Sequence, residues 1–135
     1  GDLTWNKELA LVCPVSLIDP VDVYVTSHHG LEQSGSPALL SALHPRVAIM
    51  NNGATKGGSP QAWQIVKNSR GLEDLWQGHY SVEGGATHNV ATEFIANPDE
   101  ACKGKTIELS AALDGSFTVT NTRTGFRKKY PAKAP

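Results

Sequence analysis

The sequence has little cysteine, no long apolar run and no excess of charge of one sign. Cys13 and Cys102 lie far apart and outside any CxxC pattern, so a thiolate metal site is not predicted, while two buried thiols or one disulfide both stay open. No stretch approaches the ~18–20 apolar residues that span a bilayer, and the N-terminus lacks the basic and apolar regions of a signal peptide. We therefore expect no membrane contact, and composition leaves the cellular compartment open.

The balance of charge also argues against one class of partner. Lys and Arg number 12 and Asp and Glu number 13, which gives a formal net charge of -1. A chain this close to neutrality has no overall field to hold a polyanion, so nucleic acid is not favoured as a partner. The basic residues near the C-terminus are interpreted as a solvated tail. With 135 residues, 39% of them hydrophobic, the chain is long enough for one domain with its own core.

Helical and strand patterns alternate over the first two thirds of the chain. Helical composition at residues 6–12 precedes a β-branched strand pattern at 21–26. The pairs Ser36-Pro37 and Ser59-Pro60 each supply an N-cap and a first-turn proline for a helix. The strand patterns that follow these two helices lie at residues 46–50 and 72–76. This alternation predicts an α/β fold with a right-handed parallel sheet.

The last third of the chain has a different pattern. Residues 84–104 form an irregular connection with one helical turn near 91–95. Residues 106–111 and 117–121 flank the turn at Asp114-Gly115 and predict a β-hairpin, and another strand follows at 126–130. We therefore expect an α/β half-domain over residues 1–83, a connection over 84–104, and a small antiparallel β appendage over 105–135.

Polar segments follow the predicted parallel strands at the point where each strand ends. They are Ser27-His28-His29-Gly30, Asn51-Asn52-Gly53 and Gln77-Gly78-His79-Tyr80. The carboxyl ends of parallel strands meet at one edge of a sheet, where ligands commonly bind. The sequence therefore predicts a functional site that contains residues of all three segments.

The second of these segments opens a Gly-rich loop, residues 51–58. Asn51, Asn52 and Lys56 are candidates for substrate contacts, and His79 joins them from the third segment. Backbone amides of the loop, ahead of a helix, would bind a phosphate or carboxylate. The alternative is that Asn-Asn-Gly only forms a turn, because Asn and Gly both tolerate positive φ. The sequence alone does not separate these two interpretations.

A family resemblance adds to this interpretation. Gly1-Asp2-Leu3, followed by a helix, a strand and Ser27-His28-His29-Gly30, resembles the later ligand motifs of metallo-β-lactamase-fold hydrolases. The closest branch includes the C-terminal nuclease-like domain of the DNA-uptake competence protein and the phosphorylcholine esterases. The resemblance covers residues 1 to about 80 and implies the C-terminal half of an αββα sandwich.

The resemblance also implies a site and a reaction. The aspartate that matches Asp2 bridges two divalent metal ions, usually zinc and alternatively manganese or iron, and a histidine of the pair His28-His29 completes the second ion. His29 is slightly preferred as the ligand, with His28 beside it or facing the substrate. Such a pair of ions activates a hydroxide that attacks a small-molecule ester or phosphodiester.

The sequence lacks histidines that the family pattern requires. Members of the family carry an earlier His-x-His-x-Asp-His run and a further histidine, and His44, His79 and His88 do not match either. We therefore expect this chain to be a portion of a longer polypeptide and inactive alone, with the other ligands supplied by the upstream half of the domain or by a second copy. The alternative is a non-catalytic α/β interaction module that self-associates or pairs with another chain through an exposed sheet edge.

Overall fold

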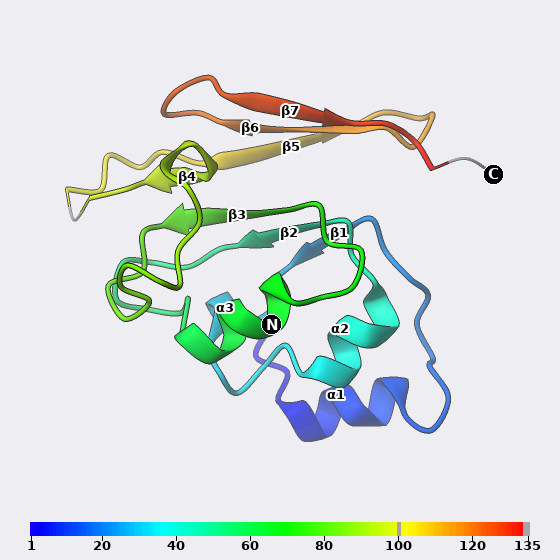
Figure 1. Ribbon diagram of the computed structural model, residues 1–135. Helices are drawn as coiled ribbons and strands as arrows, with labels where there is room; N and C mark the ends of the chain where they lie inside the picture. Colours follow the sequence, from blue (N-terminus) through cyan, green and yellow to red (C-terminus); the bar gives the residue numbers. More distant parts are fainter. Residues whose placement is uncertain (100, 134–135) are drawn as a thin grey trace.

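A parallel sheet forms the middle layer of the structure, a computed structural model that describes residues 1–99 and 101–133 (Figure 1). The strands are β1 (Val23–Val25), β2 (Val47–Met50), β3 (Asp74–His79) and β4 (Ile95–Asn97), and they lie side by side in this order. Each neighbouring pair is parallel. The predicted α/β class with a parallel sheet is confirmed.

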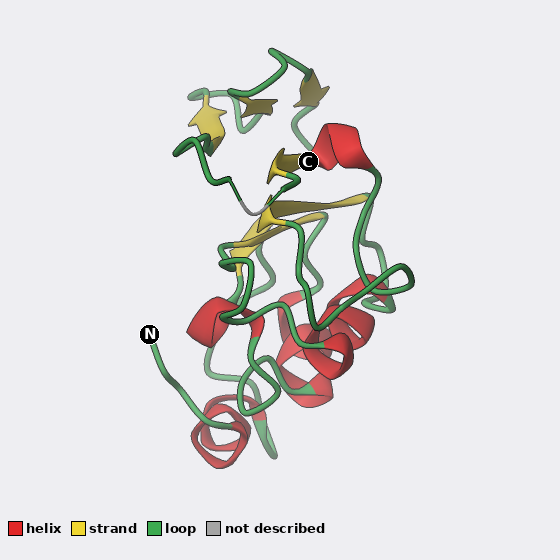
Figure 2. Ribbon diagram, turned by 90° about the vertical axis from the view of Figure 1, so that its left-hand side faces the viewer, coloured by secondary structure: helices red, strands yellow, loops and turns green. Residues whose placement is uncertain are grey.

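Helices α2 (Pro37–Leu43) and α3 (Pro60–Lys67) lie on one face of this sheet, and α1 (Trp5–Val12) packs against α2 on the side away from the strands (Figure 1, Figure 2). The two predicted N-caps are present. Ser36 Oγ accepts a hydrogen bond from the Leu39 amide at 3.2 Å, and Ser59 Oγ accepts one from the Ala62 amide at 3.4 Å. Among the described residues, no helix is long and apolar enough to cross a membrane.

The opposite face of the parallel sheet is covered by an antiparallel sheet (Figure 1). Its strands are β5 (Ile107–Ala111), β6 (Phe117–Asn121) and β7 (Arg127–Tyr130), in that order. The two sheets share a buried core, whose members are Val47, Trp76, Phe117, Val119 and Tyr130. The segment expected to be an appendage is therefore a third layer. The alternation in β6 predicts one buried face, but it does not say what that face packs against.

The segment 84–104 also differs from the expectation of an irregular connection. It contains the predicted helical turn, η2 (Thr92–Phe94), and then β4, which extends the parallel sheet. A strand of three residues is too short to show a period of two in the sequence, which is why β4 was not predicted. Glu100 of this segment and residues 134–135 of the predicted appendage lie outside the described residues.

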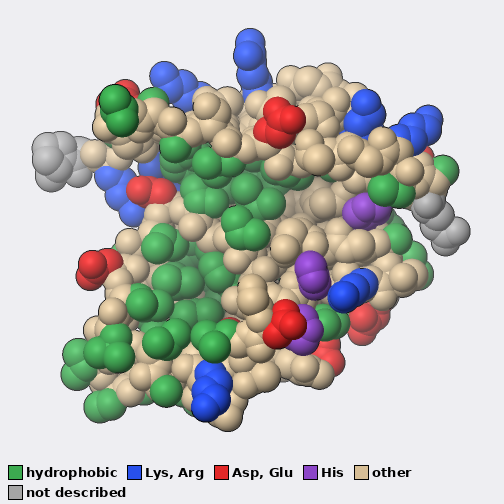
Figure 3. All heavy atoms as spheres, turned by 180° about the vertical axis from the view of Figure 1, so that it is seen from behind, with side chains coloured by type: hydrophobic (Ala, Val, Ile, Leu, Met, Phe, Trp, Pro, Cys, Tyr) green, Lys and Arg blue, Asp and Glu red, His purple; other side chains and the backbone are tan. Residues whose placement is uncertain are grey.

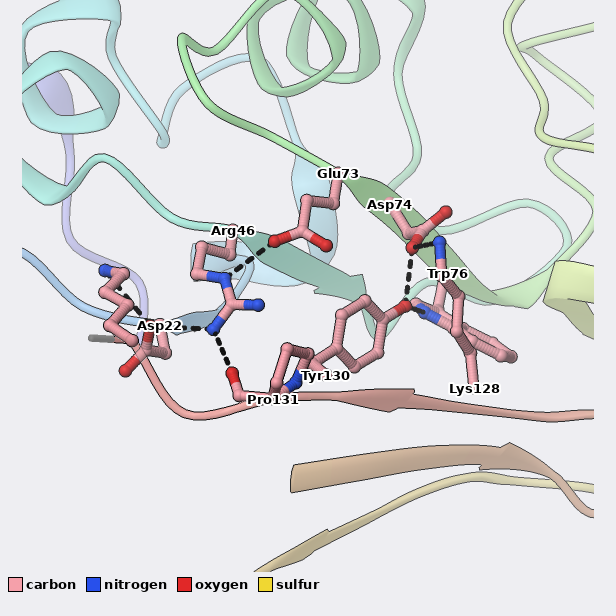
Figure 4. A network of polar contacts seen from close by, with 9 residues as sticks. Asp22, Arg46, Glu73, Asp74, Trp76, Lys128, Tyr130 and Pro131 are labelled. Atoms are coloured by element: carbon pink, nitrogen blue, oxygen red, sulfur yellow. Dashed lines mark hydrogen bonds and ion pairs between the residues drawn. The ribbon is translucent and has the colours of Figure 1, made fainter. Parts of the chain in front are cut away.

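A polar network ties β7 to the first residue of β3 (Figure 4). Asp74 Oδ2 accepts hydrogen bonds from Lys128 Nζ and from the Tyr130 hydroxyl, both at 2.6 Å. The Trp76 indole N–H donates to the same hydroxyl at 3.1 Å. Burial and the neighbouring Asp74 carboxylate raise the pKa of Tyr130 well above its ordinary value, so this side chain acts as a neutral donor.

Arg46, just before β2, extends this network along the same end of the sheet (Figure 4). Its Nε donates to Glu73 at 2.7 Å, and its Nη1 donates to the Pro131 carbonyl at 2.8 Å. The ion pair with Glu73 raises the pKa of Arg46 above its ordinary value. The antiparallel layer is thus fastened at the amino ends of the parallel strands.

Candidate metal centre at the carboxyl ends of the strands

The predicted polar segments lie together at the carboxyl ends of the parallel strands. The short 3-10 segment η1 (Ser27–Gly30) follows β1 directly, the Asn51-Asn52 pair follows β2, and His79 is the last residue of β3. Histidine side chains gather on one side of the molecular surface, with acidic and basic side chains among them (Figure 3). We refer to this edge of the sheet as the rim.

Asp2 and His28 lie next to each other at the rim. Asp2 Oδ1 is 3.9 Å from His28 Nε2, and the His28 amide donates a hydrogen bond to the Gly1 carbonyl at 3.0 Å. The other ring nitrogen of His28, Nδ1, is buried and has no hydrogen-bond partner among the described residues. The carboxylate and the imidazole are therefore close enough to bind one shared ion.

The two histidines adopt an unusual backbone conformation. His28 has φ 51° and ψ 40°, and His29 has φ 59° and ψ 17°, so both are left-handed. This conformation costs a residue other than glycine about 1–2 kcal/mol, and such strain gathers at functional sites. The chain therefore turns at the two histidines themselves. Because of this turn, adjacent side chains need not point to opposite sides.

His29 is held by the strand next to it. Its Nδ1 is 3.0 Å from the Asn51 carbonyl oxygen. A carbonyl oxygen only accepts hydrogen bonds, so the bond requires the proton on Nδ1, and Nε2 then carries the lone pair of the ring. Histidines that bind metals commonly pass their second nitrogen to a carbonyl or a carboxylate in this way. The contact supports His29 as a metal ligand.

Asn52 is buried and joins β2 to β3. Its Nδ2 donates to the His79 carbonyl at 2.9 Å and to the Gly53 carbonyl at 3.0 Å, and its Oδ1 accepts from the His79 amide at 3.4 Å. The Asn52 side chain is therefore occupied by contacts within the protein. The structure assigns it a part in holding two strand ends together.

The remaining candidates in the Gly-rich loop are at the surface. Asn51 is exposed, and its Oδ1 accepts a hydrogen bond from Thr26 Oγ1 at 3.2 Å. Lys56 is exposed, and its carbonyl accepts from the Gly53 amide at 2.8 Å in a tight turn. The amides of Gly58 and Ser59 are also bonded to carbonyls of the protein. Of the two interpretations of this loop, these contacts favour the turn.

His79 contacts Cys102, which the sequence did not place at the rim. Its Nε2 is 3.5 Å from the sulfur of Cys102, and that sulfur is 3.7 Å from Asn97 Oδ1. A hollow of about 230 Å³ adjoins this contact, with Asn51, His79 and Lys105 in its wall. Asn97 and the place of Cys102 at the rim were not predicted, because β4, which brings this segment to the sheet, was not predicted. Neither cysteine is buried or in a disulfide: Cys13 and Cys102 are both free and exposed.

The donors described at the rim do not by themselves group into a metal site. Among residues 1–99 and 101–133, no three His, Cys, Asp or Glu side chains are grouped closely enough to hold a metal ion. A zinc ion in a protein takes about three or four protein ligands. Asp2, His28 and His29 are residue types that bind such ions, but these three side chains do not form a group of this kind.

Comparison with known proteins yields no relative. No protein-family model, no curated protein and no solved structure matches the chain.

Proposed function

We propose that this chain is the C-terminal half of a metallo-β-lactamase-fold hydrolase domain that acts on an ester or a phosphodiester. The observation that carries the proposal is the 3.9 Å distance between Asp2 Oδ1 and His28 Nε2 at the end of β1. The layers support it as well, because helices cover one face of a sheet whose other face packs on a second sheet. This is the order of layers in half of an αββα sandwich, continued into the next sheet.

In this proposal, Asp2, His28 and His29 contribute to a site for divalent ions, with zinc preferred over manganese or iron. When bound, two such ions supply an activated hydroxide that attacks the ester or phosphodiester. The Asp2 carboxylate would help to hold such ions, and His29, oriented by the Asn51 carbonyl, would present Nε2 to them. The other ligands come from the upstream half of the same domain or from a second copy.

Removing either kind of donor should weaken zinc binding. Asp2→Asn and His29→Gln should each reduce the affinity of the chain for zinc by about tenfold or more, since each removes one of few ligands. Isothermal titration with zinc chloride measures this change. His44→Asn is the matched control, because His44 is exposed at the end of α2 and Asn tolerates its left-handed backbone.

Two further measurements bear on the whole proposal. The native protein, isolated together with any polypeptide joined to it, should contain metal and hydrolyse p-nitrophenyl acetate or bis(p-nitrophenyl) phosphate. The 135-residue chain alone should be inactive towards both esters. A native protein free of metal and inert towards both would contradict the proposal, as would equal loss of zinc binding in His44→Asn.

A specific observation also favours a second candidate, a self-associating α/β module. In the described chain β1 is an open edge of the parallel sheet, Val25 on it is 55% exposed, and Leu109 on β5 is 40% exposed. Hydrophobic side chains form a broad patch on this side of the molecule (Figure 3). Such edges and patches pair with other chains.

If this second function holds, light scattering after size exclusion should give a dimer. Val25→Lys should then return the protein to a monomer, because a charge on the edge strand opposes pairing. Thr118→Lys on β6, distant in sequence from the open edge, is the control and should leave the dimer intact. A monomer at high concentration would rule against this candidate.

A further inference from the structure

The loop between β2 and α3, residues 51–59, contacts both the backbone of the histidine turn and the imidazole ring of His29. The Asn51 carbonyl accepts the hydrogen bond from His29 Nδ1 at 3.0 Å. From the other end of the loop, the Gly58 amide donates to the His29 carbonyl and the Ser59 amide donates to the Gly30 carbonyl, both at 2.9 Å. We name residues 51–59 the clamp loop, because it holds His29 from two directions.

Gly57 brings the clamp loop against the backbone of His29. Its φ is 75°, and a Cβ atom built on it would lie 2.0 Å from the His29 carbonyl oxygen and 2.6 Å from the His29 Cβ. Atoms in proteins do not approach this closely, and the obstacle is largely backbone, which cannot rotate away. Position 57 therefore accepts only glycine if His29 is to remain where it is.

Gly30 lies close to a more yielding neighbour on the other side of the turn. A Cβ at this position, where φ is also 75°, would lie 2.9 Å from the Met50 side chain at the end of β2. The turn is thus enclosed between the end of β2 and the clamp loop. The left-handed backbone of His28 and His29 is unfavourable by itself, so these contacts are what sustain it.

We propose that the clamp loop is a positioning device for His29, and that Gly57 is the positioning residue on which it depends. The clamp holds the proton on Nδ1 and thereby keeps the lone pair on Nε2, the form in which an imidazole binds a metal ion through Nε2. That the ion is present rests on the proposed function. The tautomer and the orientation of the ring follow from the hydrogen bonds and do not require the ion.

The first test reads the tautomer directly. Long-range proton–nitrogen NMR spectra of the metal-free wild type at pH 8 should show the His29 proton on Nδ1. Gly57→Ala should shift His29 toward the form protonated on Nε2, which free imidazole side chains favour. Gly71→Ala is the matched control: Gly71 also has positive φ, at 82°, but nothing lies within 4 Å of its Cβ position. It bears the same backbone strain and should leave His29 unchanged.

The second test uses zinc as the probe. Gly57→Ala should weaken zinc affinity by about 10–100-fold, the loss typical when the group that orients a ligand is disturbed, while Gly71→Ala should change it by less than about twofold. A wild-type His29 with its proton on Nε2 would overturn the clamp, and this result needs no variant to fold. A folded Gly57→Ala protein with an unchanged tautomer would also overturn it. If wild-type His29 carries its proton on Nδ1 but the protein binds no zinc, the result would support the clamp and overturn the proposed metal site.

Discussion

Replacing Glu8 with alanine is expected to lower the free energy of unfolding by about 3–5 kcal/mol. The Glu8 side chain on α1 is 0% exposed, and its two carboxylate oxygens accept hydrogen bonds from the Gly35 and Ser36 amides, both at 2.7 Å. Both amides belong to buried residues, so the substitution removes two charge-assisted hydrogen bonds and leaves two buried donors without acceptors. Urea denaturation measures the loss.

Two further variants test whether the loss of stability comes from the Glu8 carboxylate and not from any substitution of a glutamate. Glu32→Ala, at an exposed position, should change stability by no more than about 0.5 kcal/mol. Glu8→Gln keeps one acceptor oxygen and should cost roughly half as much as Glu8→Ala. If Glu8→Ala costs less than about 1 kcal/mol, the carboxylate does not hold the start of α2 as described.

The second large effect is expected at Asp74. Asp74→Ala should lower the free energy of unfolding by about 2–3 kcal/mol, because the buried Tyr130 hydroxyl loses its acceptor. The contact with Lys128 adds at most about 1 kcal/mol, since the lysine side chain is 43% exposed and solvent screens the pair. Chemical denaturation monitored by intrinsic tryptophan fluorescence would follow the loss.

A double-mutant cycle makes the assignment at Asp74 specific. Asp74→Ala and Tyr130→Phe should show a coupling energy of about 1–2 kcal/mol, because the two groups share one hydrogen bond. Lys128→Ala paired with Asp74→Ala should show a smaller coupling. Equal coupling for both pairs would contradict the view that the tyrosine, and not the lysine, fastens β7.

The helices and the first strands follow closely from the sequence, because their signals are local. Ser36-Pro37 and Ser59-Pro60 predict helix starts that the side-chain caps confirm. The role of Glu8 has no local signal. A glutamate in the first turn of a helix is usually exposed. The amides that donate hydrogen bonds to the Glu8 carboxylate belong to Gly35 and Ser36, which are far along the chain, so no local pattern predicts this contact.

The candidate site was likewise predicted in part. The order of strands and polar segments predicts the paired histidines at one edge, where the structure has them, and the family resemblance adds Asp2, whose carboxylate lies beside His28. Residue types do not reveal which acceptor each backbone amide bonds to, as the Gly-rich loop shows. Its composition is compatible with an anion cradle, but the Gly58 amide is used by His29.

The two ends of the parallel sheet differ in what a change of sequence there would disturb. Asp74 and Arg46 at the amino ends secure the third layer, whereas His28, Asn51 and His79 lie at the carboxyl ends. The contacts that join the layers and the candidate site residues thus lie at opposite ends of the parallel strands. A substitution among the side chains at the carboxyl ends leaves the ion pairs of Asp74 and Arg46 in place, so variants of the candidate site can be made without loosening the third layer.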